Sequence, residues 1–168
     1  MFEESELAYF DTDKSADDPY NFFGFRNSNE TRRRWADNGL LDPSGRGTLA
    51  VDLDGQVIGD VGWHPVVYGP PPCPASFNIG ISLLASERGK GYGSIAQDQL
   101  ADYLFGVHAV HRLEASTDVS NIAEQRALVK AGFTREGVAR GAQFRSGRFR
   151  DLVVFSRLRD DSPDRGTR

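Results

Sequence analysis

The sequence predicts an α/β or α+β domain built around one mixed sheet. Three features indicate this class. The chain has 168 residues, of which 39% are hydrophobic, enough for one domain with a core of its own. Its hydrophobic pattern alternates between a period of two, typical of strands, and spacings of three and four, typical of helices. An apolar run at residues 77–84 leads through a glycine-rich turn into one of these helical patterns.

The part of the chain before residue 70 predicts a helix and a β-hairpin. Residues 1–20 are acidic apart from a short apolar island, so they predict at most one edge strand. Cap residues at 27–29 precede a short helix at residues 30–36, which Gly39 could close. Apolar alternation on both sides of a turn at Asp54 and Gly55 then predicts a hairpin over residues 48–63.

The middle of the chain predicts a strand, a glycine-rich turn suited to binding a phosphate, and a helix. The proline-rich residues 69–74 must form a loop, because proline cannot donate ladder hydrogen bonds. After the strand at 77–84, residues 88–93 place three glycines before a helical pattern that continues to Val107. A glycine turn that opens a helix leaves unpaired backbone N–H groups for an anion. The apolar positions expected to face the core are Ile95, Ala96, Leu100, Tyr103, Leu104 and Val107.

The last third of the chain completes the sheet. Residues 112–117 predict a strand, and residues 122–131 predict a helix that Gly132 ends. Two strands follow, at residues 133–140 and 150–158, and the polar residues 159–168 predict a frayed tail. The positions of the second helix expected to be buried are Ile122, Leu128 and Val129.

Composition narrows the function. The formal charge of -4 and the pI near 5.4 argue against nucleic-acid binding. Cys73 is the single cysteine, so no intramolecular disulfide can form, which fits a reducing cytoplasm. The acidic first residues do not resemble a signal peptide, and no apolar run is long enough to span a membrane. We therefore expect a soluble cytoplasmic protein without a metal site.

A dinucleotide-binding fold is one alternative for the glycine turn. Gly91 begins a loose match to the dinucleotide fingerprint, whose last position is Ala96. However, six residues separate Gly91 from Leu84 at the end of the strand, and Glu114, near the spacing of a ribose-binding acid, falls in the middle of a strand. Too little chain remains for a second nucleotide-binding half, so a Rossmann-type oxidoreductase is the weakest alternative.

Three ordered motifs resemble the GNAT N-acetyltransferase superfamily. Arg88, Gly91 and Gly93 match its acetyl-CoA-binding motif, in which arginine or glutamine precedes glycines by three and five positions. Asn121, followed eleven and twelve residues later by Gly-Phe, matches its second block. Residues 136–156 resemble the closing hairpin of the RimJ/RimL-like branch. The resemblance covers residues 48–158 and implies one acetyltransferase-like domain over residues 1–168, with a mostly antiparallel mixed sheet and a divergent part at residues 1–47.

This resemblance implies acetyl-CoA as co-substrate. The turn's backbone N–H groups would face the pyrophosphate, with charge added by Arg88 or Lys90, although either side chain could simply be solvated. The strand end would pair its backbone with the pantetheine arm, and Asn121 would bind the same arm or act only as a helix N-cap. The cofactor-binding residues implied in this way are Ile81, Leu83, Arg88, Gly89, Lys90, Gly91, Gly93, Ser94 and Asn121.

The family's proton-transfer residues are missing at their usual places. Asn78 and Ser116 stand where the family often has acids or bases, and Leu128 stands where it has a tyrosine. The replacement candidates are His64, Asn78, Ser116 and Glu114. Two of them have a structural alternative, namely a strand-end position for His64 and an ion pair with Arg112 or another arginine for Glu114.

The function implied by the resemblance is N-acetyl transfer from acetyl-CoA to a primary amine of a small molecule or of a protein N-terminus. A non-catalytic CoA-binding or regulatory module is the main alternative, because three proton-transfer groups are absent. The sequence also leaves open a homodimer formed through the closing hairpin or an edge strand.

Overall fold

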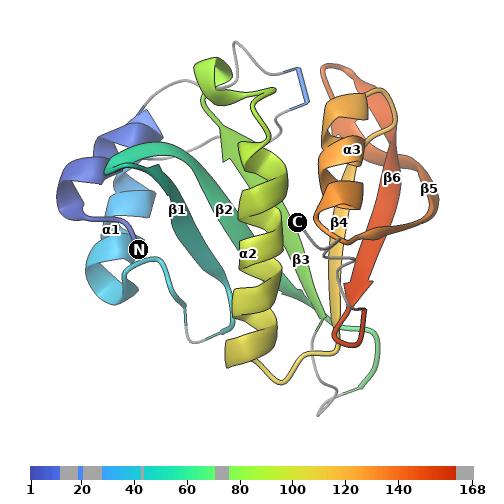
Figure 1. Cartoon of the computed structure of the whole chain (residues 1–168), viewed down its shortest axis with the longest axis horizontal. Coiled ribbons are helices and arrows are strands. Elements are labelled where there is room, and N and C mark those ends of the chain that lie inside the picture. The colour runs from blue at the N-terminus through green and yellow to red at the C-terminus, as the bar shows by residue number, and fades with distance from the viewer. Residues whose placement is uncertain (12–18, 21–27, 43, 71–75, 162–168) are drawn as a thin grey trace, which may run out of the picture.

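The computed structural model describes residues 1–11, 19–20, 28–42, 44–70 and 76–161 (Figure 1). Not one helix in these residues combines the length and apolar character that crossing a membrane would need. In chain order, the elements are η1 (Glu4–Asp11, a 3-10 helix), α1 (Ser28–Asn38), β1 (Gly47–Leu53), β2 (Gln56–Val66), β3 (Ser76–Leu83), η2 (Ala85–Glu87, also 3-10), α2 (Tyr92–Val107), β4 (Arg112–Asp118), α3 (Ile122–Lys130), β5 (Thr134–Arg145) and β6 (Arg148–Leu158).

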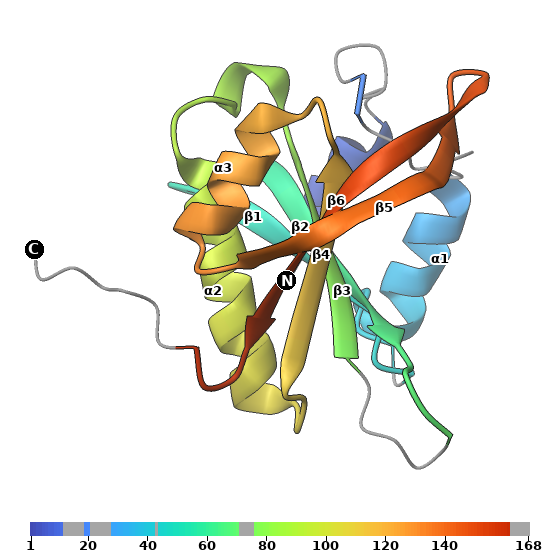
Figure 2. The same cartoon turned by 90° about the vertical axis from the view of Figure 1, so that its right-hand side faces the viewer.

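The six strands form one sheet in the order β1-β2-β3-β4-β6-β5. Neighbouring strands are antiparallel except for β3 and β4, which are parallel. Helices α2 and α3 cover one face of the sheet, and α1 lies on the other (Figure 2). The mixed, mostly antiparallel sheet confirms the predicted fold class. It also excludes the Rossmann alternative, because a dinucleotide-binding sheet is mostly parallel, whereas the sheet described here has a single parallel pair.

The main core lies between the sheet and α2 and α3. Trp63, Phe77, Leu113 and Phe155 come from four strands and pack on this side with the buried face of α2. That face differs from the predicted one, because Ala96, Gln97, Leu100, Ala101 and Leu104 are the buried residues of α2. Each of these positions is three or four residues from another, so the helical periodicity was read correctly but its phase was partly wrong.

Five apolar side chains predicted to be buried are exposed in the two helices. They are Ile95, Tyr103 and Val107 in α2 and Ile122 and Val129 in α3. Within α3 itself, Leu128 alone is buried. A short helix packed at the edge of the sheet presents only a narrow stripe to the core, so hydrophobic residues outside the stripe remain in solvent.

The sequence predicted at most one edge strand in residues 1–20, but residues 4–11, which contain the apolar island, form the helix η1. Phe2, Leu7 and Tyr9 pack with Leu40 in a second apolar cluster on the face that carries α1. The Trp35 Nε1–H donates to the carbonyl of Phe2 at 2.9 Å and fixes η1 against α1. The apolar island was therefore real, but its residues fold onto a helix rather than into the sheet.

The remaining predicted elements agree with the structure where it describes them. Gly39 ends α1 with a φ of 63°, and Asp54 and Gly55 form the hairpin turn with φ values of 54° and 83°. β5 and β6 are longer than predicted, and β2 continues past His64 instead of ending there. Asn27 at the predicted cap, residues 71–74 of the proline-rich loop, including Cys73, and residues 162–168 of the predicted tail lie outside the described residues.

Candidate functional site

The parallel strands β3 and β4 separate and leave a cavity between them. They pair only at Phe77 with Leu113 and at Asn78 with Glu114, and beyond these positions they diverge. The cavity has a volume of about 630 Å³. Its lining comes from β3 and the glycine turn, from β4 and α3, and from more distant segments: Ile79–Leu83, Arg88, Gly89, Gly91, Gly93, Ser94; Ala115–Asp118, Asn121, Ala123, Glu124, Arg126, Ala127, Lys130; Pro19, Tyr20, Gln143, Arg145 and Leu152.

The backbone of β3 faces this cavity at alternate residues. Leu84 N–H donates to the carbonyl of Ile58 at 2.9 Å, so these two residues form a hydrogen-bonded pair with β2. In an antiparallel ladder such pairs alternate with pairs that do not exchange hydrogen bonds. Leu83 and Ile81 therefore direct their backbone groups away from β2, toward the side where β4 has moved away. This end of β3 can pair with an extended ligand in place of a strand.

The glycine turn brings the N-terminus of α2 to the same cavity. Gly89 and Gly91 have φ values of 76° and 92°, a region that residues with a Cβ rarely adopt. Gly91 is the N-cap of α2, and the Ser94 hydroxyl donates to its carbonyl at 2.8 Å. The first turn of a helix leaves backbone N–H groups without intrahelical acceptors and carries a partial positive charge. Since Gly91, Gly93 and Ser94 line the cavity, this end is suited to an anion.

Eight of the nine residues predicted to bind a cofactor line the cavity. They are Ile81, Leu83, Arg88, Gly89, Gly91, Gly93, Ser94 and Asn121. The exception is Lys90, whose Nζ forms an exposed ion pair with Glu87 at 3.1 Å. Arg88 also has a structural contact, because its Nε–H donates to the carbonyl of Leu83 at 3.1 Å and ties the turn to the strand end.

Asn121 caps helix α3, as its structural alternative predicted. Its side-chain oxygen accepts from the backbone N–H of Glu124 at 3.2 Å, and its amide nitrogen donates to the Thr117 hydroxyl at 3.1 Å. The backbone N–H of Asn121 donates to the carbonyl of Asp118. In a capping box, this N–H would instead donate to the side chain of Glu124. The amide retains one further N–H, and the residue lines the cavity, so capping and ligand binding are compatible.

The four candidates for proton transfer share one face of the sheet, opposite α2. His64 pairs with Asn78, and Asn78 pairs with Glu114, which places the three side chains in a row across β2, β3 and β4. Ser116 lies two residues beyond Glu114 on the same face, and it is the one member of the four that lines the cavity. The row lies where β3 and β4 are still paired, at the closed end of the gap.

Charges around this row are largely paired. Partial burial and the positive charge of Arg46 lower the pKa of His64. Arg112 Nε–H donates to Glu114 at 2.9 Å, so the predicted ion pair of Glu114 is present. A hydrogen bond with Glu114 also raises the pKa of Tyr68. The carboxylate of Glu114 is therefore already hydrogen-bonded to Arg112 and Tyr68 on this face of the sheet.

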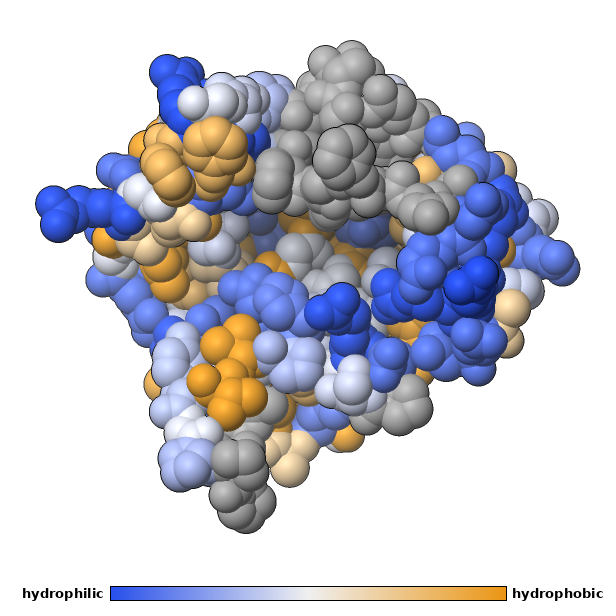
Figure 3. Space-filling view, turned by 180° about the vertical axis from the view of Figure 1, so that it is seen from behind, coloured by the Kyte–Doolittle hydropathy of each residue, from blue (hydrophilic) through white to orange (hydrophobic). Residues whose placement is uncertain are grey.

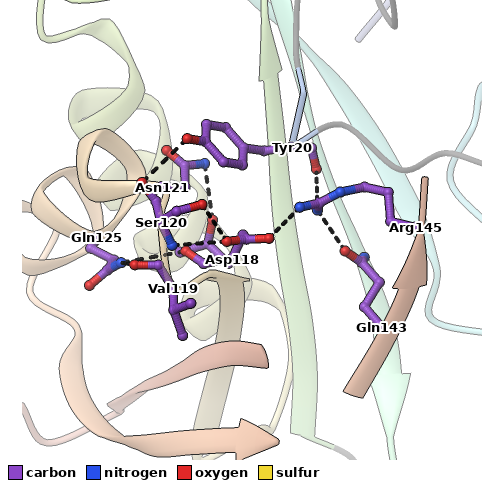
Figure 4. A network of polar contacts seen from close by, with 9 residues as sticks. Tyr20, Asp118, Val119, Ser120, Asn121, Gln125, Gln143 and Arg145 are labelled. Carbon is purple, nitrogen blue, oxygen red and sulfur yellow. Dashed lines mark hydrogen bonds and ion pairs between the residues drawn. The ribbon is translucent and has the colours of Figure 1, made fainter. Parts of the chain in front are cut away.

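A buried ion pair forms the end of the cavity opposite the glycine turn (Figure 4). Arg145, from β5, binds the carboxylate of Asp118 at the end of β4, and both residues are buried. Arg145 also donates to the carbonyl of Tyr20 at 3.3 Å, and the Tyr20 hydroxyl donates to the carbonyl of Ser120 at 3.3 Å. Burial opposes the ionisation of Asp118, but hydrogen bonds from Ser120 and Arg145 prevail and lower its pKa. These contacts join three separate segments.

Sequence reasoning also missed the buried acid Asp60, on the face opposite α2. Asp60 lies in β2 beside Ser82 of β3, and the hydroxyl of Tyr9 donates to its carboxylate at 2.8 Å. Seen from behind, the molecule is hollowed near the middle of this sheet face (Figure 3). A signal was present, because Asp60 interrupts the apolar and glycine residues of 57–63. Its link to Tyr9 was not readable, because at most one edge strand was expected from residues 1–20.

Comparisons with known proteins agree on one family. The model of the acetyltransferase (GNAT) domain matches residues 4–134, which begins well before the motifs noted in the sequence. A probable N-acetyltransferase, YjcK of Bacillus subtilis (strain 168), is 33% identical over 108 residues. The alignment covers 64% of this chain and 58% of that protein, so the chain spans little more than half of this relative.

Two solved structures share the fold over nearly their whole length. The ribosomal-protein-alanine N-acetyltransferase from Brucella melitensis has a TM-score of 0.77 at 21% identity, covering 94% of this chain and 96% of its own. The spermidine N-acetyltransferase from Vibrio cholerae, solved with CoA and spermine, has a TM-score of 0.79 at 19% identity, covering 95% and 94%.

Proposed function

Since the chain belongs to the GNAT acetyltransferase family, we propose that it transfers the acetyl group of acetyl-CoA to a primary amine. The acceptor is a small molecule or a protein N-terminus. One observation carries the proposal: the glycine turn and the backbone edge of β3 that faces away from β2 open onto the same cavity. These are the two features that a ligand with a pyrophosphate and an extended amide-containing arm requires.

Each part of the cofactor has a proposed place along this edge. Backbone N–H groups of Gly89, Gly91, Gly93 and Ser94 hold the pyrophosphate at the start of α2. The pantetheine arm pairs with Ile81 and Leu83 and contacts Asn121. The N–H of Leu83 then polarises the thioester carbonyl, which supplies electrostatic stabilisation of the tetrahedral oxyanion.

We assign proton transfer to a group of residues and not to a single one. Among the candidates Ser116 is the one at the cavity wall, where it can hydrogen-bond a water or donate to the CoA thiolate. His64, Asn78 and Glu114 lie in the adjacent row and can relay protons through water. Orienting the amine against a bound thioester already contributes several kcal/mol to lowering the barrier, so a dedicated acid is not required.

The test is direct. We expect acetyl-CoA to bind in calorimetry, and a panel of primary amines, including peptides with free N-termini, to release CoA thiol that is detected with a thiol reagent. The acetylated amine is then identified by mass spectrometry. Absence of acetyl-CoA binding in the folded protein would refute the cofactor site as well as the activity.

A non-catalytic CoA-binding module is the second candidate. It is favoured by Asn78, Ser116 and Leu128 at the family's usual proton-transfer positions, and Leu128 is fully buried in the core. Tight acetyl-CoA binding without CoA release across the amine panel would identify this alternative.

The proposal extends to the whole chain as one domain, residues 1–168, in the cytoplasm. The single cysteine, which permits no intramolecular disulfide, is in keeping with that compartment. A homodimer through the closing hairpin or an edge strand is compatible with this proposal, and size measurement in solution tests it.

A further inference from the structure

Two buried polar side chains lie side by side on the sheet face opposite α2, one in the cavity wall and one behind it. Asp60 and Ser82 are direct partners in the antiparallel ladder of β2 and β3. Such partners have their Cβ atoms about 4.5–5.5 Å apart and point to the same face. Asp60 is 7% exposed and Ser82 is 5% exposed. Ser82 lines the cavity, so the carboxylate of Asp60 lies one side chain behind the cavity wall.

The carboxylate of Asp60 is held in place from outside the sheet. The Tyr9 hydroxyl lies 2.8 Å from Asp60 Oδ1 and 3.2 Å from the backbone carbonyl of Ser82, so η1 is fixed over both residues. The fixed hydroxyl orients the carboxylate, and a hydrogen bond to an ionised group is among the stronger ones in proteins. A buried carboxylate is costly to desolvate unless it is paired or hydrogen-bonded.

Among the residues that the structure describes, none is a hydrogen-bond partner of the Ser82 hydroxyl, although this hydroxyl is buried. Most buried polar atoms in proteins are satisfied, and an unsatisfied one needs a specific explanation. Here the atom belongs to a residue of the cavity wall, so a group of a bound ligand can form a hydrogen bond with it. The side chain stands between Ile81 and Leu83 on the opposite face of β3, next to the backbone N–H proposed to hold the thioester carbonyl.

We propose that Ser82 and Asp60 form the subsite that receives the acceptor's amino group in its ammonium form. An ammonium has three N–H donors and no acceptor, which matches a hydroxyl oxygen and a carboxylate, both of them acceptors. The subsite thus selects cationic amines and brings the nitrogen close to the thioester. This inference rests on the proposed function, since it takes the adjacent cavity to hold acetyl-CoA.

Pairs of ligands that differ only in one functional group test the subsite. Primary amines and the alcohols of the same carbon skeleton are titrated into the CoA-bound protein by calorimetry. We expect the wild type to bind at least one amine at least tenfold more tightly than its alcohol. In Asp60→Asn, which retains an oxygen for the Tyr9 hydroxyl, this preference falls to less than about twofold. Acetyl-CoA affinity stays the same, and so does the affinity for the alcohol.

Two further variants separate recognition from structure. Asp54→Asn changes an exposed aspartate in the hairpin turn and is expected to keep the full preference. Ser82→Ala removes a buried hydroxyl that has no partner, so it leaves the melting temperature unchanged or raises it, while amine affinity falls several-fold. This opposite change in stability and affinity is not expected of a residue that only packs.

The outcomes also separate this inference from the proposed function. If acetyl-CoA does not bind the wild type, the proposed function is refuted. If acetyl-CoA binds and no amine is preferred over its alcohol, the ammonium subsite is wrong. It is equally wrong if the preference persists in folded Asp60→Asn, or if Ser82→Ala leaves amine affinity unchanged.

Discussion

The two ends of the cavity are made in different ways. The end at the glycine turn consists of backbone groups from one continuous stretch, Ile81 to Ser94. The opposite end consists of side chains from three distant segments, joined by the buried pair of Arg145 and Asp118 and by Tyr20. A site made of contiguous backbone is specified by local sequence, whereas a site made of distant side chains depends on the completed fold. We therefore expect changes at the first end to alter affinity and changes at the second to alter stability.

The largest effect is expected from Arg145→Met. Removing one partner of a buried ion pair leaves the other charge uncompensated, which costs about 3–5 kcal/mol of unfolding free energy. Acetyl-CoA affinity of the folded fraction should change by less than about threefold, because the pyrophosphate end is untouched. Urea denaturation and calorimetry measure the two quantities.

Arg148→Met is the matched control for this variant. Arg148 is the ladder partner of Arg145 in the same hairpin but is exposed. Its loss should change stability by less than about 0.5 kcal/mol. Adding Asp118→Asn to Arg145→Met should recover part of the lost stability, because the unpaired charge is removed. A large loss of acetyl-CoA affinity in folded Arg145→Met would show that the two ends are not independent.

The next largest effect is expected from Gly91→Val, at the other end. A side chain here projects toward the anion site and blocks the backbone approach, so acetyl-CoA affinity should fall at least about 100-fold, or roughly 2.7 kcal/mol. The φ of 92° also strains a β-branched residue, at a cost of about 1–2 kcal/mol of stability. Unchanged calorimetric binding by the folded variant would contradict the proposed pyrophosphate site.

Gly93→Ala is a smaller and cleaner change at the same end. An added Cβ would meet only Leu83 Cδ1 at 3.7 Å and Ile81 Cδ1 at 3.9 Å, which are ordinary contacts, so the fold should tolerate it. Acetyl-CoA affinity should fall about tenfold, or roughly 1.4 kcal/mol, with no loss of melting temperature. Gly106→Ala, in the same helix, meets nothing within 4 Å and should leave affinity unchanged while adding up to about 1 kcal/mol of stability. Equal affinities for the two variants would argue against close contact at Gly93.

The smallest effect is expected away from both ends, at Glu136. Hydrogen bonds from Arg112 and Ser156 lower its pKa from 4.5 to about 2. Because the folded carboxyl binds a proton less readily than the unfolded one, this stabilisation is present above pH 4.5 and is lost as the pH falls toward 2. Solvent screens the partly exposed pair, so Glu136→Gln should cost less than about 1 kcal/mol at pH 7.

The pH dependence provides the check on Glu136. The difference in unfolding free energy between wild type and Glu136→Gln should shrink between pH 7 and pH 3, and acetyl-CoA affinity at pH 7 should be equal in both. A difference that grows in acid would contradict the assigned direction of the pKa change.

The sequence predicted the order of helices and strands from residue 48 onward, because local residue patterns indicate where these elements begin and end. Asp54 and Gly55 define the hairpin, and Gly91 and Gly132 mark where helices begin and end. Burial within the helices was less predictable. Ile122 and Val129 satisfy a helical spacing, but α3 presents Leu128 to the core, and only the position of the sheet decides which face that is.

The same distinction applies to the candidate site. Arg88, Gly91 and Gly93 lie within six residues, so their joint position at the cavity followed from a motif. Asp60 and Tyr9 are separated by 51 positions, and no local pattern brings them together. The region before residue 48 supplies Tyr9 and Tyr20, and its folding onto the sheet could not be read from a short apolar island.

The place of β6 in the sheet has a consequence for folding. β6 follows every other strand in the chain, yet it lies between β4 and β5. Until it arrives, β4 has an unsatisfied edge and Arg157, which β6 carries, cannot reach Asp98 of α2 at 2.7 Å or the carbonyl of Ala131 at 3.0 Å. Pairings between strands that are remote in the chain form slowly, because the chain loses the entropy of loop closure before the new contacts stabilise it. We therefore expect insertion of β6 to be a late event in folding, and nascent chains that lack it to expose a sheet edge prone to intermolecular pairing.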